Sequence, residues 1–449
     1  MTPQVSYDKL VSKWAPVLNE ETAGPISDHY RKQVTAAILE NQERAMREEA
    51  SQSSFGMINE YGTATGDVDK FDPVLISLVR RAMPNLMAYD VCGVQPMSGP
   101  TGLIFAMKSK YKTTRGGATA DSEALFNEAA TGFTGDSSFT SQPATPSGIV
   151  DSDFDNDTDS AHDAERLTAL AGGGMDTVRG ENLGNGTEAE FAEMGFTIDK
   201  QTVTAKTRAL KAEYTMELAQ DLKAIHGLDA ETELANILSA EVLAEINREV
   251  IRTINSQAKS GGALTASGDA SADFDLNTDA DGRWSVEKFK GLIFQLEKES
   301  NKIAKETRRG RGNFIICSSN VASALAAAGM LDYTPALSTN LNVDDTGNTF
   351  AGVLNGKMRV YVDPYAVTDY ATVGYKGSNA YDAGLFYCPY VPLTMVRAVG
   401  ENSFQPKIGF KTRYGMVSNP FVGDTPANGL ANAKTNQYYR IFRVANILG

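Results

Sequence analysis

Cysteine is scarce in this chain, and its scarcity argues against several kinds of site. Only three cysteines occur among 449 residues, at Cys92, Cys317 and Cys388. They are odd in number, lie far apart and are never spaced as Cys-x-x-Cys, which favours free thiols in a reducing compartment over disulfides. The sequence therefore predicts neither zinc binding nor redox chemistry at cysteine.

Histidine is equally rare, and the usual catalytic motifs are missing. None of His29, His162 and His226 lies in a His-Glu-x-x-His motif or beside a serine nucleophile, and His226 before Gly227 is typical of a helix C-terminus. The chain also lacks Gly-x-Ser-x-Gly, the phosphate-binding Gly-x4-Gly-Lys-Ser/Thr loop and a Gly-x-Gly-x-x-Gly motif after a strand. We predict a protein that is not an enzyme and carries no cofactor.

Long apolar runs are absent as well. No stretch of eighteen apolar residues occurs, and the N-terminal residues combine neither a basic region nor a continuous apolar segment. The sequence thus predicts no membrane span and no secretory signal, with folding in the cytoplasm. The remaining composition, 42% hydrophobic and 8% aromatic, is that of a folded chain long enough for two or three domains.

Negative charge is concentrated in one part of the chain. Residues 114–193 hold 16 Asp and Glu against 3 Arg and no Lys, a net of −13 out of −14 for the whole protein. The same block contains 11 glycines, about twice the average share. These residues are predicted to form a separate, loop-rich unit.

Two charged motifs each allow two interpretations. The run 151–165 has Asp at alternate positions, as in a calcium loop, but counting from Asp153 the sixth and twelfth positions are Thr158 and Ala164 instead of Gly and Glu. A solvated acidic loop is favoured, with weak divalent-cation binding as the alternative. The motif RRGRG, residues 308–312, fits a basic helix end and a tight turn, with contact to phosphate or single-stranded nucleic acid as the alternative.

Hydrophobic periodicity predicts an α+β chain. Asp28 can cap a helix over 29–50, whose narrow apolar stripe needs a partner helix or serves only temporarily. Strand-like alternation from Pro100 to Tyr111 and over 196–215 predicts a long hairpin with the acidic block at its tip. A helix of about 30 residues starts near Asp229, with Leu234, Ile237, Leu238, Val242, Ile246, Val250 and Ile254 on its apolar face.

The C-terminal half mixes both kinds of element. A helix is predicted from about residue 286 to 307, followed by a buried strand NFIICS, a small-residue helix over 321–328, and strands at KMRVYVD, YATVGYKG and GLFYCPYVPLT. Such a mixture predicts a domain with a central sheet. The stretch 83–97, broken by two prolines, is predicted to be an extended connector with apolar side chains available for burial.

Several segments resemble one known family. RRAMPNLMAYDVCGVQPMSGPTG, residues 80–102, is similar to the signature near the mature N-terminus of T4-type major capsid proteins of tailed phages. The resemblance continues in order through EMGFTIDKQTVTAKTRALKAEYT, EINREV, RGNFII, FAGVLNGKMRVYVDPYA and FQPKIGFKTRYG, from about Pro73 to Gly415. Collinear agreement of this extent is far more specific than any short motif.

The resemblance implies the HK97-type capsid fold, an α+β fold with an N-arm, an E-loop hairpin, a P-domain with a spine helix, and an A-domain. The implied domains are a helical propeptide or scaffolding segment (1–60), the N-arm (61–99), the E-loop (100–113 and 194–215), an insertion domain (114–193), the P-domain helix region (216–260), the A-domain (261–388), and P-domain return strands with the C-terminal segment (389–449).

The family also implies removal of the N-terminal segment by a prohead protease that cuts after a glutamate two residues beyond Ile or Leu. Ile58-Asn59-Glu60 fits this rule, which makes Tyr61 the first mature residue. Ile38-Leu39-Glu40 fits as well but lies inside a predicted helix. We therefore predict processing at Ile58, Glu60 and Tyr61.

The function implied is that of a major capsid protein, assembled as hexamers in the host bacterial cytoplasm and located in the virion, around packaged double-stranded DNA. The implied partners are other copies of the chain, a vertex protein, a portal, a scaffolding core, the prohead protease and decoration proteins, but no membrane. Alternatives are a pentameric vertex paralogue, an encapsulin-like compartment protein, and a soluble calcium-dependent binding or enzymatic protein.

Overall fold

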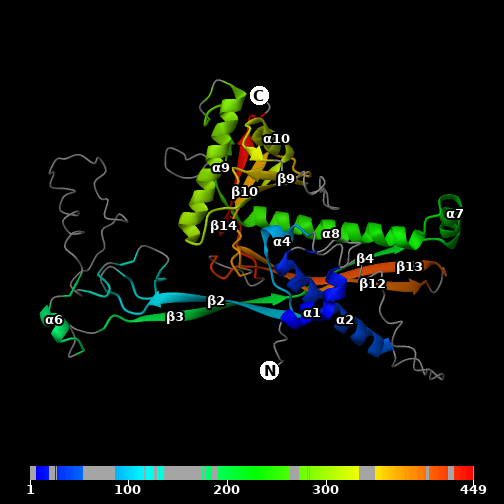
Figure 1. The fold of residues 1–449 in the computed structure, drawn as a ribbon, viewed down its shortest axis with the longest axis horizontal. Coiled ribbons are helices and arrows are strands. Elements are labelled where there is room, and N and C mark those ends of the chain that lie inside the picture. Colours follow the sequence, from blue (N-terminus) through cyan, green and yellow to red (C-terminus); the bar gives the residue numbers. More distant parts are fainter. Residues whose placement is uncertain are drawn as a thin grey trace. The chain divides into compact units, whose positions relative to one another are not determined.

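The chain divides into two compact units in the computed structural model (Figure 1). The body comprises residues 1–104 and 201–449, and the insert unit comprises residues 105–200. The structure describes residues 7–19, 26, 28–53, 86–115, 118–125, 129–130, 132–135, 174–175, 177–184, 191–262, 273–280, 282, 284–332, 349–379, 381–400, 404–422 and 429–447.

Two N-terminal helices, α1 (Tyr7–Leu18) and α2 (His29–Ser53), pack against each other in the body. Asp28 begins α2 as predicted, because its side chain accepts a hydrogen bond at 3.0 Å from the main-chain N–H two residues on. Lys13 of α1 forms ion pairs with two glutamates of α2. The helix α2 therefore has a partner helix, while Val34 and Ile38 of its apolar stripe belong to the core cluster of the body.

The stretch predicted to be an extended connector is extended only in part. Residues 88–91 form one helical turn, α4 (Ala88–Val91), and are followed by the short strand β1 (Gly93–Val94). This main chain is buried, so its polar groups need partners, and the turn supplies them: the N–H of Cys92 bonds to the carbonyl of Ala88 at 2.8 Å. The predicted burial of apolar side chains is confirmed for Leu86, Met87, Tyr89 and Val91.

A four-stranded sheet lies next to these elements, in the order β1, β12 (Leu385–Val399), β13 (Pro406–Ser418), β4 (Lys206–Glu213). β1 runs parallel to β12, and the other neighbours are antiparallel. β1 is an edge strand of this sheet, since within the described chain it pairs with β12 alone.

The predicted strand 196–215 is in fact two strands that belong to different sheets. β3 (Met194–Thr204) pairs with β2 (Thr101–Tyr111), and the arrows of the two strands point in opposite directions (Figure 1). At Ala205 the chain leaves this ribbon and continues as β4, which pairs with β13 over eight residues from Lys206 to Glu213. The prediction of one uninterrupted strand was wrong, because alternation within a strand does not reveal which partner strand it meets.

The long helix is α8 (Ala230–Gln257), preceded by the shorter α7 (Met216–His226). Gly227 separates them with a φ of 66°, a left-handed conformation that glycine adopts without strain. The predicted apolar face of α8 is confirmed for Leu238, Val242, Ile246, Val250 and Ile254, which are buried, and Leu234 is half-buried. Ile237 is the exception, because its side chain is 63% exposed.

A larger mixed sheet forms the rest of the body. The order along it is β5 (Ala258–Ser260), β14 (Asn436–Ala445), β11 (Tyr370–Gly374), β7 (Phe314–Ser318), β10 (Met358–Asp363), β9 (Thr349–Leu354) and β8 (Leu331–Asp332), with β6 (Asp273–Asp275) also paired to β14. Two helices, α9 (Ser285–Thr307) and α10 (Ser319–Ala327), follow the predicted helical segments closely.

This sheet is covered on both faces, and β7 shows how. All five of its residues are buried. Phe314 and Ile316 belong to the core cluster that includes α8, whereas Ile315 and Cys317 belong to the cluster that includes α9 and α10. A run of consecutive apolar residues is what a strand buried on both sides requires.

The insert unit contains most of the β2–β3 ribbon and the short helix α6 (Thr177–Glu181). Tyr111 and Phe133 meet edge to face with ring centroids 4.4 Å apart, and Arg115 donates a hydrogen bond to the carbonyl of Gly135 at 2.7 Å. The described residues of this unit thus have packing contacts of their own.

Candidate functional site: surfaces without catalytic groups

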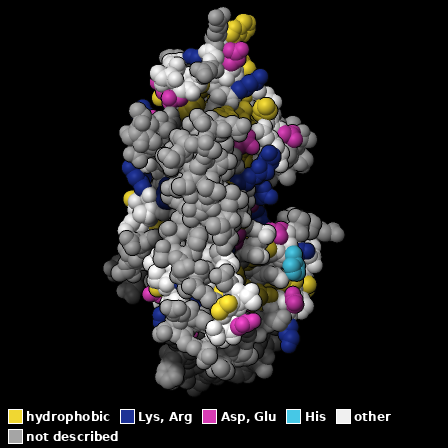
Figure 2. Space-filling view, turned by 90° about the vertical axis from the view of Figure 1, so that its left-hand side faces the viewer, with side chains coloured by type: hydrophobic (Ala, Val, Ile, Leu, Met, Phe, Trp, Pro, Cys, Tyr) yellow, Lys and Arg dark blue, Asp and Glu magenta, His cyan; other side chains and the backbone are white. Residues whose placement is uncertain are grey.

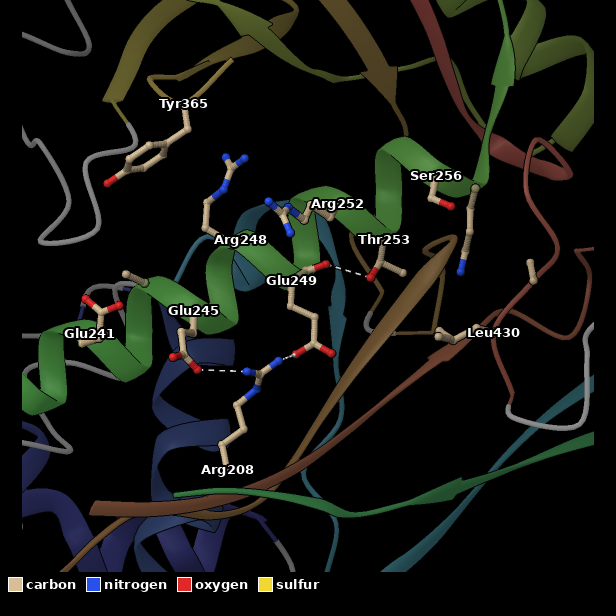
Figure 3. A pocket seen from close by; sticks show the side chains of 13 residues that line it. Arg208, Glu241, Glu245, Arg248, Glu249, Arg252, Thr253, Ser256, Tyr365 and Leu430 are labelled. Atoms are coloured by element: carbon tan, nitrogen blue, oxygen red, sulfur yellow. Dashed lines mark hydrogen bonds and ion pairs between the residues drawn. The ribbon is translucent and has the colours of Figure 1, made fainter. Parts of the chain in front are cut away.

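A groove of about 850 Å³ runs along α8 in the body, and six of its thirteen lining residues are charged (Figure 3). Glutamates at positions 241, 245 and 249 and arginines at 248 and 252 follow the spacing of one helical turn. Such spacing places each kind of charge along one line of the helix surface.

Arg208 of β4 crosses from the sheet to this helix. Its guanidinium forms ion pairs with Glu245 at 2.9 Å and Glu249 at 2.5 Å (Figure 3). Glu249 also accepts a hydrogen bond from the hydroxyl of Tyr414. Burial, together with the Glu249 carboxylate, raises the pKa of Tyr414. The cluster therefore joins β4, β13 and α8.

Arg248 points to the other side of the groove. It forms an ion pair with the buried carboxylate of Asp363 at 2.6 Å and lies 5.1 Å from the centre of the Tyr365 ring. Asp363 also accepts a hydrogen bond from the Tyr370 hydroxyl at 2.8 Å. Burial is the larger cause, and the nearby Asp363 charge the next, of the raised pKa of the Tyr370 hydroxyl. The groove can bind a polar surface, but its lining has no histidine or cysteine to serve as base or nucleophile.

The second candidate surface is the β2–β3 ribbon. Lys108 and Asp199 form an ion pair at 2.9 Å and thus lie on one face. Because side chains alternate along a strand, the residues next to them in sequence lie on the opposite face. That opposite face, called the ribbon face below, carries six large hydrophobic side chains that are 50–67% exposed: Leu103, Phe105, Met107, Met194, Phe196 and Ile198.

Most of the sequence-predicted site lies outside the described residues. This applies to Ile58, Glu60 and Tyr61, to the acidic run 151–165, and to His162. His29 is the first residue of α2, and its Nε2 lies 3.0 Å from Nε2 of Gln33. His226 is the last residue of α7, as its position before glycine predicted. The two described histidines thus lie on different helices.

The basic motif 308–312 is a helix end, as favoured. Arg308 follows α9 in a left-handed conformation with a φ of 54°, and its N–H bonds to the carbonyl of Ala304. Arg309 stacks 4.8 Å from the Phe421 ring and pairs with Asp382 at 3.4 Å. Figure 2 shows the molecule turned by 90° from the view of Figure 1. On the described part of this face, basic and acidic side chains are interspersed, with no broad field of positive charge.

The three thiols are free, as predicted, and the structure shows that all three are buried. Burial raises the pKa of Cys92, Cys317 and Cys388 to about 12. They are thus protonated at neutral pH and are poor nucleophiles and poor metal ligands. Within the described part of the chain there is no group of three or more His, Cys, Asp and Glu side chains suited to a metal ion, and no helix there is long and apolar enough to cross a membrane.

Sequence reasoning missed both surfaces. The alternation of Leu103, Phe105 and Met107 indicated an apolar strand face, but alternation does not tell whether that face is buried or exposed. The groove had a signal in the four-residue spacing of glutamates and arginines on α8. Among the described residues, the groove and the ribbon face are the candidate surfaces for contact with other chains, as in a structural protein, and neither carries a catalytic centre.

Comparison with known proteins identifies the family. A sequence model for the family described as major capsid protein Gp23 matches residues 68–444, and the chain therefore belongs to this family. It is 43% identical over 434 residues to the major capsid protein of Salmonella phage ViI, covering 95% of this chain and 93% of that protein. It is 39% identical over 480 residues to the major capsid protein of Enterobacteria phage T4, covering 92% of each.

Two weaker likenesses complete the comparison. The capsid vertex protein of Enterobacteria phage T4 is 30% identical over 252 residues, which cover 53% of this chain and 55% of that protein. A solved structure, the capsid of Myoviridae phage XM1, covers 80% of this chain and 92% of that chain at 9% identity, with a TM-score of 0.38. The chain is a structural protein of the head shell of T4-like phages, located in the virion capsid, and is not an enzyme. The compartment and calcium-dependent alternatives are set aside, and the vertex alternative is not favoured.

Proposed function

We propose that the chain assembles as hexamers into an icosahedral or prolate shell of the HK97 type around packaged double-stranded DNA. The observation that carries the proposal is the ribbon face, where six large hydrophobic side chains are exposed on a two-stranded ribbon. A folded chain rarely leaves so much contiguous apolar surface to water unless another surface covers it. The ribbon of one copy would lie on the body of the next.

The predicted domains fit this proposal. α8 would be the spine helix of the P-domain, the β2–β3 ribbon the E-loop, and the large mixed sheet with α9 and α10 the A-domain. The break at Ala205 moves the base of the E-loop, because β4 belongs to the sheet of β12 and β13. Residues 114–193 would be the insertion domain, with decoration proteins as its partners.

Charge supports an outward position for the insertion. Packaged DNA is repelled by an acidic inner wall, so a net of −13 within residues 114–193 is best placed outside. A shell in which this block lined the interior would contradict the proposal. The vertex protein, portal, scaffolding core and prohead protease are further proposed partners.

Opposite faces of β3 offer a matched test of assembly. Ile198→Asp places a charge on the ribbon face, and Thr197→Asp places the same charge on the other face one residue away; both positions are exposed. We expect Ile198→Asp to reduce shell yield at least tenfold in electron micrographs, while Thr197→Asp assembles as the parent chain does. Equal assembly of both variants would overturn the role of the ribbon face.

Processing has its own test. Intact-mass and N-terminal analysis of the chain from the megadalton fraction of its native source should show a dominant species that begins at Tyr61. A dominant full-length species would keep the shell and remove the cut after Glu60. A chain found only as a small free species would overturn the shell.

A further inference from the structure

The groove-facing side of α8 carries four charges in a palindromic order. Glu241, Glu245, Arg248 and Arg252 follow one another at intervals of four, three and four residues, which places them on one side of a helix. All four line the groove, on the side of α8 away from the buried Ile246 (Figure 3). Two acidic residues come first and two basic residues follow. This set, called the charge stripe below, therefore reads the same from its other end with the charges exchanged.

The inner and outer charges of the stripe differ in their partners. Each inner charge already forms an ion pair within the chain, Glu245 with a residue of β4 at 2.9 Å and Arg248 with a residue of β10 at 2.6 Å. The outer side chains, Glu241 and Arg252, are exposed, and neither forms a hydrogen bond or ion pair with another described residue. Like charges four residues apart repel each other on a helix. The described part of the chain thus leaves one acid and one base of the stripe without a counter-charge.

A second copy of the stripe supplies the missing counter-charges when two stripes face each other antiparallel. The midpoint of the stripe lies between residues 246 and 247. A two-fold axis through this midpoint sets Glu241 of one copy against Arg252 of the other, and the inner acid against the inner base. Parallel stripes would instead set like charges against each other. Because each pair occurs twice about the axis, the contact uses the same surface on both copies, which is the definition of an isologous contact.

An exposed apolar residue fits the same arrangement. Ile237 of α8 is 63% exposed. The two-fold axis sets Ile237 against position 256 of the second copy, where Ser256 lines the groove together with Leu430 and Ala431. Burial of Ile237 against these side chains would remove from water an apolar surface that is exposed in a single copy. One axis thus accounts both for the two outer charges and for the exposure of Ile237.

We propose that the charge stripe and Ile237 form a two-fold contact between two copies of this chain, with their α8 helices antiparallel. This contact rests on the hexamers proposed above. A ribbon that lies on the body of the next copy is a heterologous contact, which builds rings and does not join one ring to another. Six-fold rings in a shell meet across two-fold axes, so the chain needs a self-complementary surface besides the ribbon face. The stripe is such a surface on a member of a capsid protein family.

The contact should be weak in a single pair and sensitive to salt. Exposed ion pairs contribute little each, and they are screened at high ionic strength. A shell repeats the contact many times, so that weak pairs suffice to join its rings.

Charge reversal is the first test of the contact. Arg252→Glu sets acid against acid at both ends of it, and Glu241→Arg sets base against base. Each single variant should lower shell yield at least tenfold in electron micrographs, whereas the double variant exchanges both charges and should restore the yield. Asp221→Arg makes a matched change at an exposed residue of α7 and should leave the yield unchanged. Normal yield of the single variants, or no restoration by the double variant, would overturn the contact.

Engineered cysteines test the antiparallel register. Ile237 and Ser256 are both exposed and lie 19 residues apart on α8, about 28 Å, so a disulfide between these positions cannot form within one copy. A chain with both Ile237→Cys and Ser256→Cys should form disulfide-linked dimers on mild oxidation, and a chain with either cysteine alone should not. The native thiols are buried and do not interfere. Dimers from a single variant would contradict the register, and their absence from the double variant would overturn the contact.

The same cysteine pair in a chain that also carries Ile198→Asp separates this contact from the proposed function. Linked dimers without shells would show that the two-fold contact forms when the ribbon face is disrupted. Shells without linked dimers in the parent background would keep the proposed function and remove the two-fold contact.

Discussion

Strand β7 of the body and strand β2 of the ribbon are both rich in apolar residues, yet they have opposite surroundings. β7 lies between α8 on one face and α9 with α10 on the other, and all of its residues are buried. β2 leaves Leu103, Phe105 and Met107 more than half exposed. The difference teaches that apolar content serves stability within one chain in β7, whereas on the ribbon face it is left exposed, where we propose that another chain covers it.

The largest effect is expected in the body. Phe314→Ala removes a ring that is 2% exposed and lies 6.1 Å from the ring of Tyr439, centre to centre. The lost burial and the cavity left behind should lower the free energy of unfolding by about 3–5 kcal/mol. Urea denaturation monitored by circular dichroism measures this, and a loss below about 1 kcal/mol would contradict the two-sided burial of β7.

A smaller effect concerns the buried thiols of the body. Their pKa is raised by burial from 9.0 to about 12, so the folded state keeps protons that the unfolded state loses. This contribution to stability is complete below pH 9 and is lost as pH rises toward 12. Deprotonation of each thiol in the unfolded state should lower the free energy of unfolding by about 1 kcal/mol by pH 10.

Denaturation at pH 7 and pH 10, repeated with Cys317→Ala, measures the contribution of one thiol. The variant should lose less stability between the two pH values than the parent chain. An aromatic disulfide reagent should label all three thiols only after unfolding. Rapid labelling of the native chain would contradict their burial.

The ion pair on the opposite face of the ribbon should matter less. Lys108→Ala removes the partner of Asp199, whose side chain is 46% exposed, and pairs of this kind contribute about 0.2–1 kcal/mol. The loss should shrink further in high salt because exposed charges are screened. Denaturation at low and high salt checks this, and an effect above about 2 kcal/mol would mean that the ribbon is held as firmly as the body.

The smallest effect on the isolated chain is expected on the ribbon face. Phe196→Ser replaces a side chain that is 67% exposed and should change the free energy of unfolding by no more than about 0.5 kcal/mol. Assembly should nevertheless fall, as for Ile198→Asp. A large loss of stability in the unassembled chain would instead place Phe196 in a core and remove the contrast with β7.

Much of the fold was predictable because local patterns decide it. Asp28 begins α2, Gly227 ends α7, and consecutive apolar residues mark β7 as a buried strand; each signal acts within a few residues. The predictions failed where partners distant in sequence decide. Ala205 divides one alternating run between two sheets, and Ile237 remains exposed although its spacing fits the apolar face of α8.

The candidate site was predictable only in part. The resemblance led to the family, and the absence of catalytic motifs agreed with a structural role. Neither the exposure of the ribbon face nor the packing of α2 against the segment 94–98 could be predicted from the sequence. Both depend on which segment, distant in sequence, lies against a strand. Tyr30 and Asn41 are unremarkable in the sequence of a helix and gain their meaning only from the carbonyls of Val94 and Met97.

By itself, the sequence determined the positions of most helices and strands, the concentration of acid in residues 114–193, and membership in the capsid family. These follow from side-chain type and spacing along the chain. Only the tertiary structure decided which apolar faces are covered, which strand lies at a sheet edge, and where α2 packs. Burial and hydrogen bonding between distant segments are properties of pairs of surfaces, and the spacing of residues within one segment does not specify its partner.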